Sequence, residues 1–207
     1  INSIPHSIET VRNEMEALWS QAGANRVEVG KTFYTNRIKR VEDAWYSFTK
    51  EQQEGRLPES LKNIEDTTKV ITIFNSSLDE YEGLEGFGPF FYQNDNEGIL
   101  QICKSLESFS TIKLYLRVHP NLRRLNNSQN KFLKEKINVL NSVEMIPAED
   151  SVDTYALIDK SEIVIVFGST VGAEAAFAGK KVVLLGRAAY ENLDCFVIPK
   201  NHEELMT

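Results

Sequence analysis

The chain has 207 residues, of which 42% are hydrophobic, 10% aromatic and 26% charged, and these are ordinary proportions for a globular protein. Its 23 Lys and Arg against 30 Asp and Glu give a net charge of −7, so no nucleic-acid partner is expected, because nucleic-acid-binding proteins present a basic face on a basic total. No apolar run approaches the ~20 residues of a transmembrane helix and no signal peptide is recognised, so we expect a cytoplasmic protein.

The first 65 residues are predicted to be helical and to form an N-terminal extension or linker (1–65). Apolar residues recur at helical spacing over residues 8–19, and Gly23 can end that helix. A second helical pattern runs over residues 31–53. Within it, Arg37 and Arg40 are interpreted as solvated surface rather than as part of a site.

From residue 66 onward, short apolar runs alternate with helical patterns. Continuous apolar runs are typical of strands that are buried on both faces of a parallel sheet. The strand candidates are residues 70–74, 112–118, 143–146, 163–167, 182–185 and 196–198. The helix candidates between them are residues 95–109, 126–138, 151–159 and 171–178. This alternation predicts a Rossmann-like, doubly wound parallel α/β sheet over residues 66–207, preceded by the N-terminal helices.

Two cysteines, Cys103 and Cys195, lie far apart in the chain, each within an apolar pattern. We expect two buried free thiols rather than a disulfide. The cysteines and the three histidines have no metal-ligand spacing, and no metal site is expected. The chain starts at Ile1 and stops within a predicted helix start, so we interpret it as a piece of a longer protein.

The strongest functional signal follows the fourth strand candidate, where Gly168, Ser169 and Thr170 form a small-residue turn before a helix. Ligands of open parallel sheets bind beyond the carboxyl ends of the strands. Gly168 permits unusual dihedral angles and a close approach, and Ser169 and Thr170 offer hydroxyls and amides that suit a phosphate. Glu174, one turn into the helix, can accept two ribose hydroxyls. The alternative is structural: Ser169 or Thr170 is an N-cap, and Glu174 favours the helix dipole.

The second signal is the segment Arg117-Val118-His119-Pro120 after the second strand candidate. His119 leaves a buried strand at the expected binding edge, and Pro120 imposes an extended turn. An imidazole can donate to a phosphate oxygen, protonation would strengthen that bond, and Arg117 adds positive potential. The alternative interpretation of His119 is a structural histidine.

The third signal follows the first strand candidate and consists of Ser76, Ser77, Asp79 and Glu80. Ser77 and Glu80 have capping-box spacing, which is compatible with a ligand-contacting loop. The loop continues through residues 83–92, where glycines and aromatic residues are interleaved. Such a loop suits a lid, a base-stacking surface or a contact with another domain.

In this order, the segments 117–120, 150–153 and 168–175 resemble bacterial capsule polysaccharide biosynthesis proteins. These are GT-B-type glycosyltransferases related in pattern to Kdo transferases and CDP-glycerol transferases. The resemblance covers roughly residues 69–200 and concerns the C-terminal half of such enzymes, which binds the nucleotide sugar. One departure is that the second hydroxyl of the helix-start motif is a threonine rather than a serine.

The resemblance implies a role for each matching residue. His119 and Pro120 would contact the donor phosphates, Ser169 and Thr170 would hold the same phosphates, and Glu174 would meet the ribose. The full set of implied donor-binding residues is Ser76, Ser77, Arg117, His119, Pro120, Asp153, Gly168, Ser169, Thr170 and Glu174, with His119 as the catalytic residue.

We therefore predict the donor-binding domain of a glycosyltransferase for capsular or surface polysaccharide. Its substrate would be a CMP-, CDP-, UDP- or GDP-linked sugar, with no covalently bound cofactor and no metal. The other expected partners are a glycan or lipid-linked acceptor and an N-terminal acceptor domain of the same chain, without which the fragment is expected to be inactive. The full-length protein is expected at the cytoplasmic face of the inner membrane. Two alternatives are a sugar-nucleotide epimerase of the same double-Rossmann shape and a non-catalytic Rossmann-like module that binds a nucleotide or a partner protein.

Overall fold

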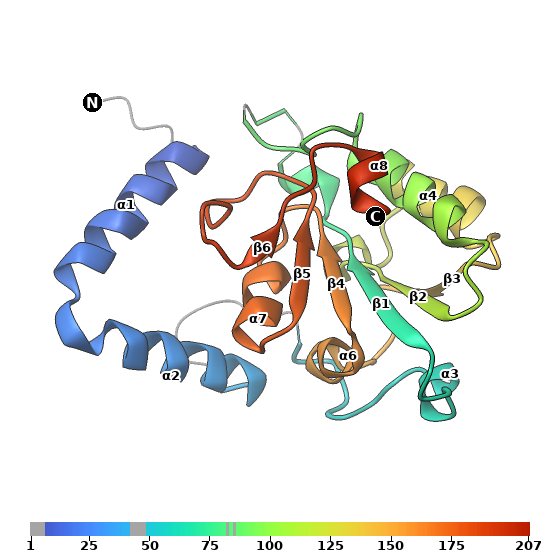
Figure 1. Ribbon diagram of the computed structural model, residues 1–207, viewed down its shortest axis with the longest axis horizontal. Coiled ribbons are helices and arrows are strands. Elements are labelled where there is room, and N and C mark those ends of the chain that lie inside the picture. The colour runs from blue at the N-terminus through green and yellow to red at the C-terminus, as the bar shows by residue number, and fades with distance from the viewer. Residues whose placement is uncertain (1–6, 42–48, 82, 85) are drawn as a thin grey trace.

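A parallel sheet with the strand order β3-β2-β1-β4-β5-β6 forms the centre of the computed structural model, which describes residues 7–41, 49–81, 83–84 and 86–207 (Figure 1). The strands are β1 (Lys69–Phe74), β2 (Ile112–Arg117), β3 (Val143–Ile146), β4 (Ile163–Val166), β5 (Lys181–Leu184) and β6 (Phe196–Val197). Every neighbouring pair is parallel. This is the doubly wound order: the chain first adds β2 and β3 on one side of β1, and it then returns to add β4, β5 and β6 on the other side. The predicted Rossmann-like fold is confirmed.

Helices cover both faces of the sheet. They are α3 (Glu59–Lys62), α4 (Asp95–Leu106), α5 (Ser128–Phe132), α6 (Thr154–Lys160), α7 (Val171–Phe177) and α8 (His202–Leu205). A π-helical segment, η4 (Leu133–Ile137), continues α5, and two short 3-10 turns, η2 (Leu78–Glu80) and η3 (Pro120–Leu122), follow β1 and β2. The predicted strands and helices therefore all occur, and the strand ends agree with the prediction to within one residue.

The strands are apolar throughout because each of them contributes to two cores. In β1, Ile71 and Ile73 pack against α4 and η4, whereas Val70 and Phe74 pack on the opposite face against α6 and α7. The second face carries one buried polar pair, in which the hydroxyls of Thr72 and Ser161 lie 2.7 Å apart. The parallel pairing of these buried strands places their carboxyl ends at one edge of the sheet.

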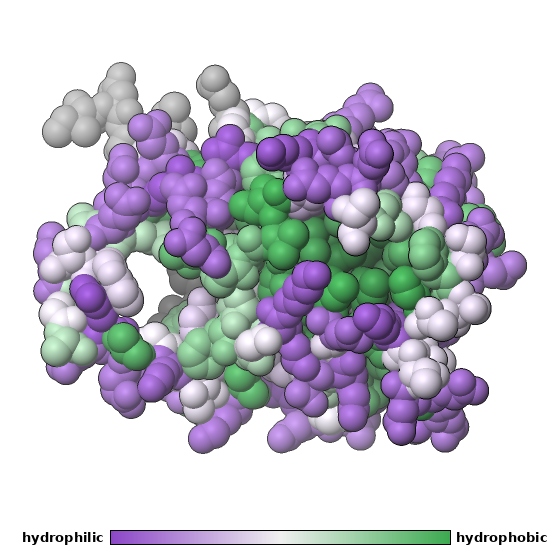
Figure 2. All heavy atoms as spheres, in the orientation of Figure 1, coloured by the Kyte–Doolittle hydropathy of each residue, from purple (hydrophilic) through white to green (hydrophobic). Residues whose placement is uncertain are grey.

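The two N-terminal helices, α1 (Ile8–Gln21) and α2 (Arg26–Ile38), form an arm beside the sheet domain. Figure 2 shows an opening between this arm and the rest of the molecule. The arm is attached at both ends: Ile8 is buried and Arg12 forms a 2.9 Å ion pair with Glu191, while the end of α2 lies against α7. Between these attachments α1 and α2 carry exposed apolar side chains, such as Leu18 and Val29.

The prediction that the second helix continues to Gln53 is wrong where the structure describes the chain. The helix ends at Ile38, and Arg40 adopts a left-handed backbone with a φ of 60°. The Val41 amide donates to the Asn36 carbonyl oxygen at 2.9 Å, which closes the helix end. Residues 49–53 form turns, and the predicted helical positions 42–48 lie outside the described residues.

The last helix, α8, is held against α4 by a histidine. The His202 Nδ1 atom lies 2.6 Å from the Tyr92 hydroxyl, and its Nε2 atom lies 2.8 Å from the Ser105 hydroxyl. Leu205 and Met206 pack against the core beside it. In the described segments, no helix has both the length and the apolar character needed to cross a bilayer.

Of the two cysteines, Cys103 is buried as expected and Cys195 is exposed. The expectation of a buried Cys195 is wrong because its apolar neighbours belong to β6, a two-residue edge strand with Val197 45% exposed. A short apolar run at a sheet edge does not bury the residue before it.

Candidate functional site

A small cavity of about 70 Å³ lies at the carboxyl ends of the three central strands. Its lining includes Asn75 after β1, His119 and Pro120 after β2, and Ser169 and Thr170 after β4. Since β1 is paired with both β2 and β4, these residues meet at the point where the strand order reverses. Ligands of doubly wound sheets bind at this point. The sequence predicted that His119, Ser169 and Thr170 meet, and the structure brings them into one cavity.

The end of β2 is fastened to the end of β1. The Asn75 Oδ1 atom accepts the His119 backbone N–H at 2.8 Å, and the His119 Nδ1 atom accepts the Asn121 N–H at 3.2 Å. A neutral ring that accepts at Nδ1 carries its proton at Nε2, so Nε2 is a donor. Burial, together with the charge of Arg117, lowers the pKa of His119 to about 4, although Asp79 opposes this shift. The ring is therefore neutral at pH 7, and it donates through Nε2–H without the added strength that protonation would give.

The turn after β4 requires glycine. Gly168 has a φ of 97°, and a Cβ at this position would lie 2.7 Å from the Arg187 carbonyl oxygen. The Ser169 carbonyl oxygen accepts the Tyr190 hydroxyl, and the Ser169 hydroxyl accepts the Val171 N–H at a long 3.4 Å. Thr170 occupies the N-cap position without a side-chain capping bond. The Thr170 hydroxyl is therefore not used as the N-cap that the structural alternative assumed.

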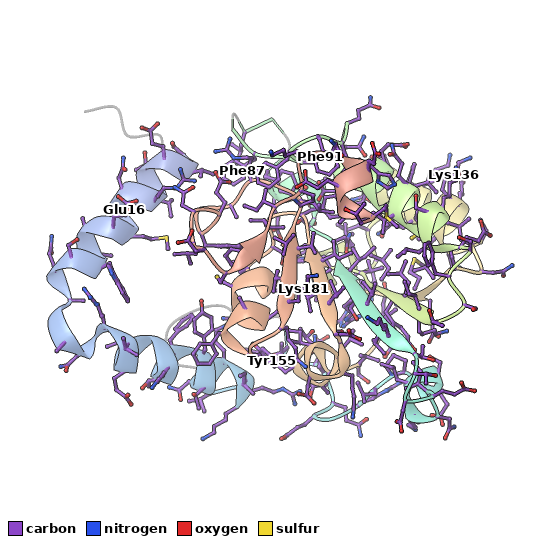
Figure 3. The ribbon with its side chains drawn as sticks, viewed as in Figure 1. Glu16, Phe87, Phe91, Lys136, Tyr155 and Lys181 are labelled. Carbon is purple, nitrogen blue, oxygen red and sulfur yellow. The ribbon has the colours of Figure 1, made fainter. Side chains whose placement is uncertain are left out.

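Glu174, the predicted ribose acid, lies in the same cavity and is paired with an arginine of the N-terminal arm. Its Oε1 atom lies 3.0 Å from Nε and 2.9 Å from Nη2 of Arg37, and the Glu174 side chain is only 7% exposed. Tyr155 of α6 lies beside this pair, and burial and the charge of Glu174 raise the pKa of Tyr155 (Figure 3). The interpretation of Arg37 as solvated surface is wrong, because its side chain is 14% exposed and lines the cavity.

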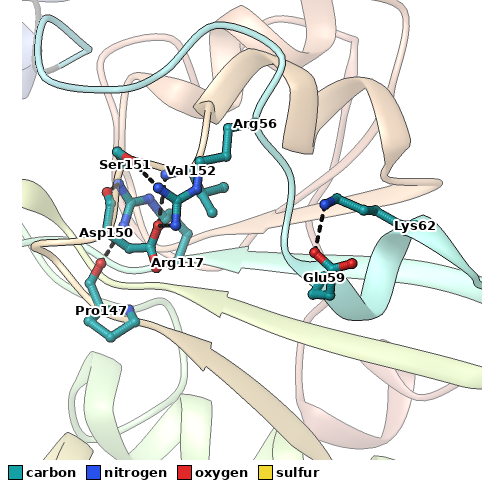
Figure 4. Close-up of polar contacts among 8 residues, drawn as sticks. All are labelled: Arg56, Glu59, Lys62, Arg117, Pro147, Asp150, Ser151 and Val152. Carbon is teal, nitrogen blue, oxygen red and sulfur yellow. Dashed lines mark hydrogen bonds and ion pairs between the residues drawn. The ribbon is translucent and has the colours of Figure 1, made fainter.

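Arg117 also lines the cavity, but its terminal nitrogens are occupied. They donate to the carbonyl oxygens of Pro147 and Asp150, the latter at 3.0 Å, and so hold the loop after β3 (Figure 4). Its Nε atom is buried without a hydrogen-bond partner. Burial lowers the pKa of Arg117 to about 10, although the charges of Asp150 and Glu149 oppose this shift, so the group stays charged at pH 7. The wall of the cavity therefore contains a buried positive charge, which Asp150 and Glu149 offset in part.

Four predicted residues do not line this cavity: Gly168, and Ser76, Ser77 and Asp153, whose side chains bond to other groups of the protein. The Ser76 hydroxyl donates to the Phe167 carbonyl oxygen at 3.2 Å, and the Ser77 hydroxyl bonds to the Asp79 carboxylate. The Asp153 carboxylate caps α6 by accepting the Tyr155 N–H at 3.0 Å. Ser76, Ser77 and Asp153 thus bond within the protein, outside the cavity that brings His119, Ser169 and Thr170 together.

Asp153 also fastens the N-terminal segment to α6. Its Oδ2 atom accepts the Gly55 N–H at 2.7 Å and lies 3.1 Å from Nη2 of Arg40. With these bonds and the cap of α6, both carboxylate oxygens are occupied, and the side chain is 6% exposed. Arg40, like Arg37, is therefore not merely solvated surface.

The aromatic loop before α4 lies at the carboxyl edge of the sheet, where Figure 3 labels Phe87 and Phe91. The Phe90 N–H donates to the Leu185 carbonyl oxygen at 2.9 Å, so the loop is tied to the end of β5. Behind it, the first residue of α4, Asp95, is fully buried and accepts the Tyr81 hydroxyl at 2.6 Å. Burial raises the pKa of Asp95 to about 7, which no sequence pattern indicated.

A larger cavity, of about 640 Å³, lies between residues 53–62 and the edge strand β3. Figure 4 shows two ion pairs in its wall, Arg56 with Asp150 at 3.5 Å and Lys62 with Glu59 at 2.6 Å. Glu54 and Glu144 make the lining acidic overall. An acidic lining disfavours phosphate, so this larger cavity is not the candidate nucleotide site. Within the described residues, no group of three His, Cys, Asp or Glu side chains is placed to hold a metal ion.

The fold and the position of the cavity define the chain as a Rossmann-like domain with its candidate site at the carboxyl edge of the sheet. A model of the family described as "putative O-antigen biosynthesis protein" matches residues 89–196, slightly more than half of the chain, and the chain belongs to this family. No curated protein sequence matches the chain.

Several solved structures are similar to the chain, and the first of them shares its fold. The β-Kdo 2,7 transferase of KpsC from Thermosulfurimonas dismutans is 17% identical, with a TM-score of 0.50, over 91% of this chain and 52% of that chain. The β-Kdo 2,4 transferase of the same KpsC is 15% identical, with a TM-score of 0.44, over 68% and 40% of the two chains. UDP-GlcNAc 2-epimerase from Neisseria meningitidis, bound to UDP-GlcNAc, is 22% identical, with a TM-score of 0.44, over 61% and 30%. The chain thus spans between about a third and half of the length of these structures.

Proposed function

We propose that this chain is the donor-binding domain of a glycosyltransferase that builds capsular or other surface polysaccharide. It binds a nucleoside mono- or diphosphate sugar, and the complete enzyme transfers the sugar to a hydroxyl of a glycan or lipid-linked acceptor at the cytoplasmic face of the inner membrane. Membership of an O-antigen biosynthesis family supports a role in surface polysaccharide. The acceptor-binding part belongs to the rest of the enzyme.

The observation that carries the proposal is that His119, Ser169 and Thr170 meet where the strand order reverses, beside the buried guanidinium of Arg117. A phosphate group placed there accepts from the His119 Nε2–H and from hydroxyls, and it lies near a buried guanidinium. Bonds to a charged acceptor are stronger than neutral ones, and a low-dielectric wall increases the attraction.

The contribution of this domain to catalysis is electrostatic. When the bond between the sugar and the phosphate breaks, negative charge develops on the phosphate oxygens. A neutral His119 donor and the hydroxyls of Ser169 and Thr170 stabilise that charge without taking a proton. This role requires no metal ligand from the chain.

The test is a calorimetric titration of the chain with CMP, CDP, UDP and GDP, together with His119→Ala and, as a matched histidine control, His202→Asn. We expect one nucleotide to bind, His119→Ala to weaken binding at least tenfold, and His202→Asn to bind like the wild type. The proposal fails if no nucleotide binds, or if both variants bind alike. In the full-length enzyme, conversion of the nucleotide sugar without an acceptor would indicate an epimerase instead.

A further inference from the structure

We infer that α2 closes the nucleotide pocket in the ligand-free chain. The Arg37 guanidinium pairs with the Glu174 carboxylate, and a nucleotide enters only when the end of α2 moves away. This inference rests on the proposed function and concerns the regulation of the same site. Arg37 lines the pocket, and Tyr34 and Arg40 hold the end of α2 beside it through Phe177 and Asp153. We call Tyr34, Arg37 and Arg40 the α2 cover.

The size of the cavity is the first observation. Its volume of about 70 Å³ is well below the roughly 300–1,000 Å³ of pockets that hold small-molecule ligands. Part of its wall comes from the segment before the sheet, namely Arg37, Thr49 and Gln52. A base, a ribose and a phosphate therefore do not fit together while this wall is in place.

The α2 cover is held mainly by polar and ring contacts. Arg37 pairs with Glu174 at 2.9 Å, Arg40 pairs with Asp153 at 3.1 Å, and the Tyr34 ring stacks on Phe177 with ring centroids 4.7 Å apart. None of the residues of α2 itself is buried. Elements with few buried apolar contacts open at low free-energy cost, so α2 is suited to move.

The turn after α2 provides a strained pivot. Arg40 has a φ of 60°, a conformation that is unfavourable for residues with a side chain. The same residue makes the ion pair with Asp153. The ion pair thus ties the turn after α2 to the start of α6.

A ligand with hydroxyls is needed to keep the pocket open. When Arg37 leaves, the buried Glu174 carboxylate loses its partner, and an unpaired buried charge is costly. Two ribose hydroxyls that donate to Glu174 replace the guanidinium. Inorganic phosphate is an anion that the Glu174 carboxylate repels, so phosphate alone does not replace the guanidinium and does not open the pocket.

The experiment compares Arg37→Gln with Arg26→Gln, a matched control on the same helix whose guanidinium lies 4.3 Å from the Trp19 ring, outside the pocket. Glutamine keeps a donor for Glu174 but removes the charge. We expect Arg37→Gln to increase hydrogen exchange of the α2 amides. We also expect it to tighten nucleotide binding about fivefold, because a fivefold change in affinity corresponds to the free energy of one partly exposed ion pair. Binding of inorganic phosphate stays unchanged, and Arg26→Gln changes none of these.

Tyr34→Leu provides a second variant that leaves Glu174 and Arg37 intact, and it shifts exchange and affinity in the same direction. Weaker nucleotide binding by Arg37→Gln overturns the inference, because Arg37 would then be a ligand of the nucleotide, and the proposed function would stand. Unchanged α2 exchange in both variants also overturns it. If neither the wild type nor the variants bind a nucleotide, the proposed function fails, and the inference with it, whatever the exchange of α2 shows.

Discussion

The side chain of Asn75 holds the backbone of His119: its Oδ1 atom accepts the His119 N–H at 2.8 Å, across the gap between the ends of β1 and β2. Asn75 is 1% exposed, and its Nδ2 atom donates to the Ser76 carbonyl oxygen at 3.1 Å. One buried amide thus fixes the direction in which the chain leaves two neighbouring strands, and with it the position of the imidazole.

Replacing Asn75 tests this positioning. Asn75→Ala removes the acceptor of the His119 N–H, and we expect nucleotide affinity to fall about tenfold and stability to fall by about 1–3 kcal/mol. Asn75→Asp keeps an acceptor at the same place and is the matched control, with a smaller loss of affinity. Calorimetric titration and urea unfolding measure the two effects. Equal affinities for Asn75→Ala and the wild type would show that the His119 backbone needs no such support.

His119 makes stability depend on pH in a defined direction. Its pKa is about 4 in the folded chain and ~6.5 when unfolded, so the unfolded state takes up a proton first as the pH falls. The wild type therefore loses stability, about 2 kcal/mol, between pH 6.5 and pH 4. In His119→Asn this loss is absent. Urea unfolding of both proteins across this range checks the difference, and parallel curves would contradict a depressed histidine pKa.

Asp95 makes the folding stability depend on pH in the opposite direction. Its pKa is about 7 in the folded chain and ~3.9 when unfolded, so the folded state holds its proton longer as the pH rises. The wild type loses stability from this group between pH 4 and pH 7. Asp95→Asn is isosteric and stays neutral. We expect the difference in unfolding free energy between this variant and the wild type to be about 3 kcal/mol more in favour of the variant at pH 8 than at pH 4. A constant difference between the two proteins would refute the raised pKa.

Asp153 is expected to contribute to stability through three contacts rather than to ligand binding. Asp153→Ala removes the cap of α6, the acceptor of the Gly55 N–H and the partner of Arg40. We expect a loss of about 2–4 kcal/mol in the free energy of unfolding. Calorimetric titration of the folded fraction should show unchanged nucleotide affinity or, because the α2 cover loosens, a slight increase. A variant of wild-type stability would show that these contacts are dispensable.

The turn after β4 offers a comparison of two glycines. Gly168→Ala meets both a left-handed backbone and the Arg187 carbonyl oxygen, whereas Gly179, with a φ of 78°, has open space around a Cβ. We expect Gly168→Ala to cost about 2–4 kcal/mol and Gly179→Ala about 1 kcal/mol. Thermal unfolding separates the two, and equal losses would mean that the close approach at Gly168 can relax.

The sheet was predictable because its strands are apolar on both faces, so residues 70–74 and 163–167 differ from every helical segment in pattern. The cluster of His119, Ser169 and Thr170 was predictable for a related reason. Parallel strands place their carboxyl ends at one edge, whatever the loops between them do.

Other features depend on contacts that a single sequence does not reveal. The helical pattern of α2 gave no reason to place Arg37 against Glu174, which is 137 positions away in the chain. Asp153 and Ser77 have residue types that suit a ligand as well as a protein partner, and only the neighbouring groups, the Gly55 N–H and the Asp79 carboxylate, decide between the two. The raised pKa of Asp95 arises from burial, which an acidic residue in a helix start does not predict.

The attachment of α8 determines how far a recombinant piece of this protein has to extend. His202 satisfies two hydroxyls at once, that of Tyr92 before α4 and that of Ser105 within it, while Leu205 and Met206 cover apolar surface nearby. In a chain that ends before Asn201, both hydroxyls would lose their partner and the apolar surface would be exposed to water. Exposed apolar surface promotes self-association. A recombinant protein that ends at β6 would therefore aggregate more readily than one that extends past Met206.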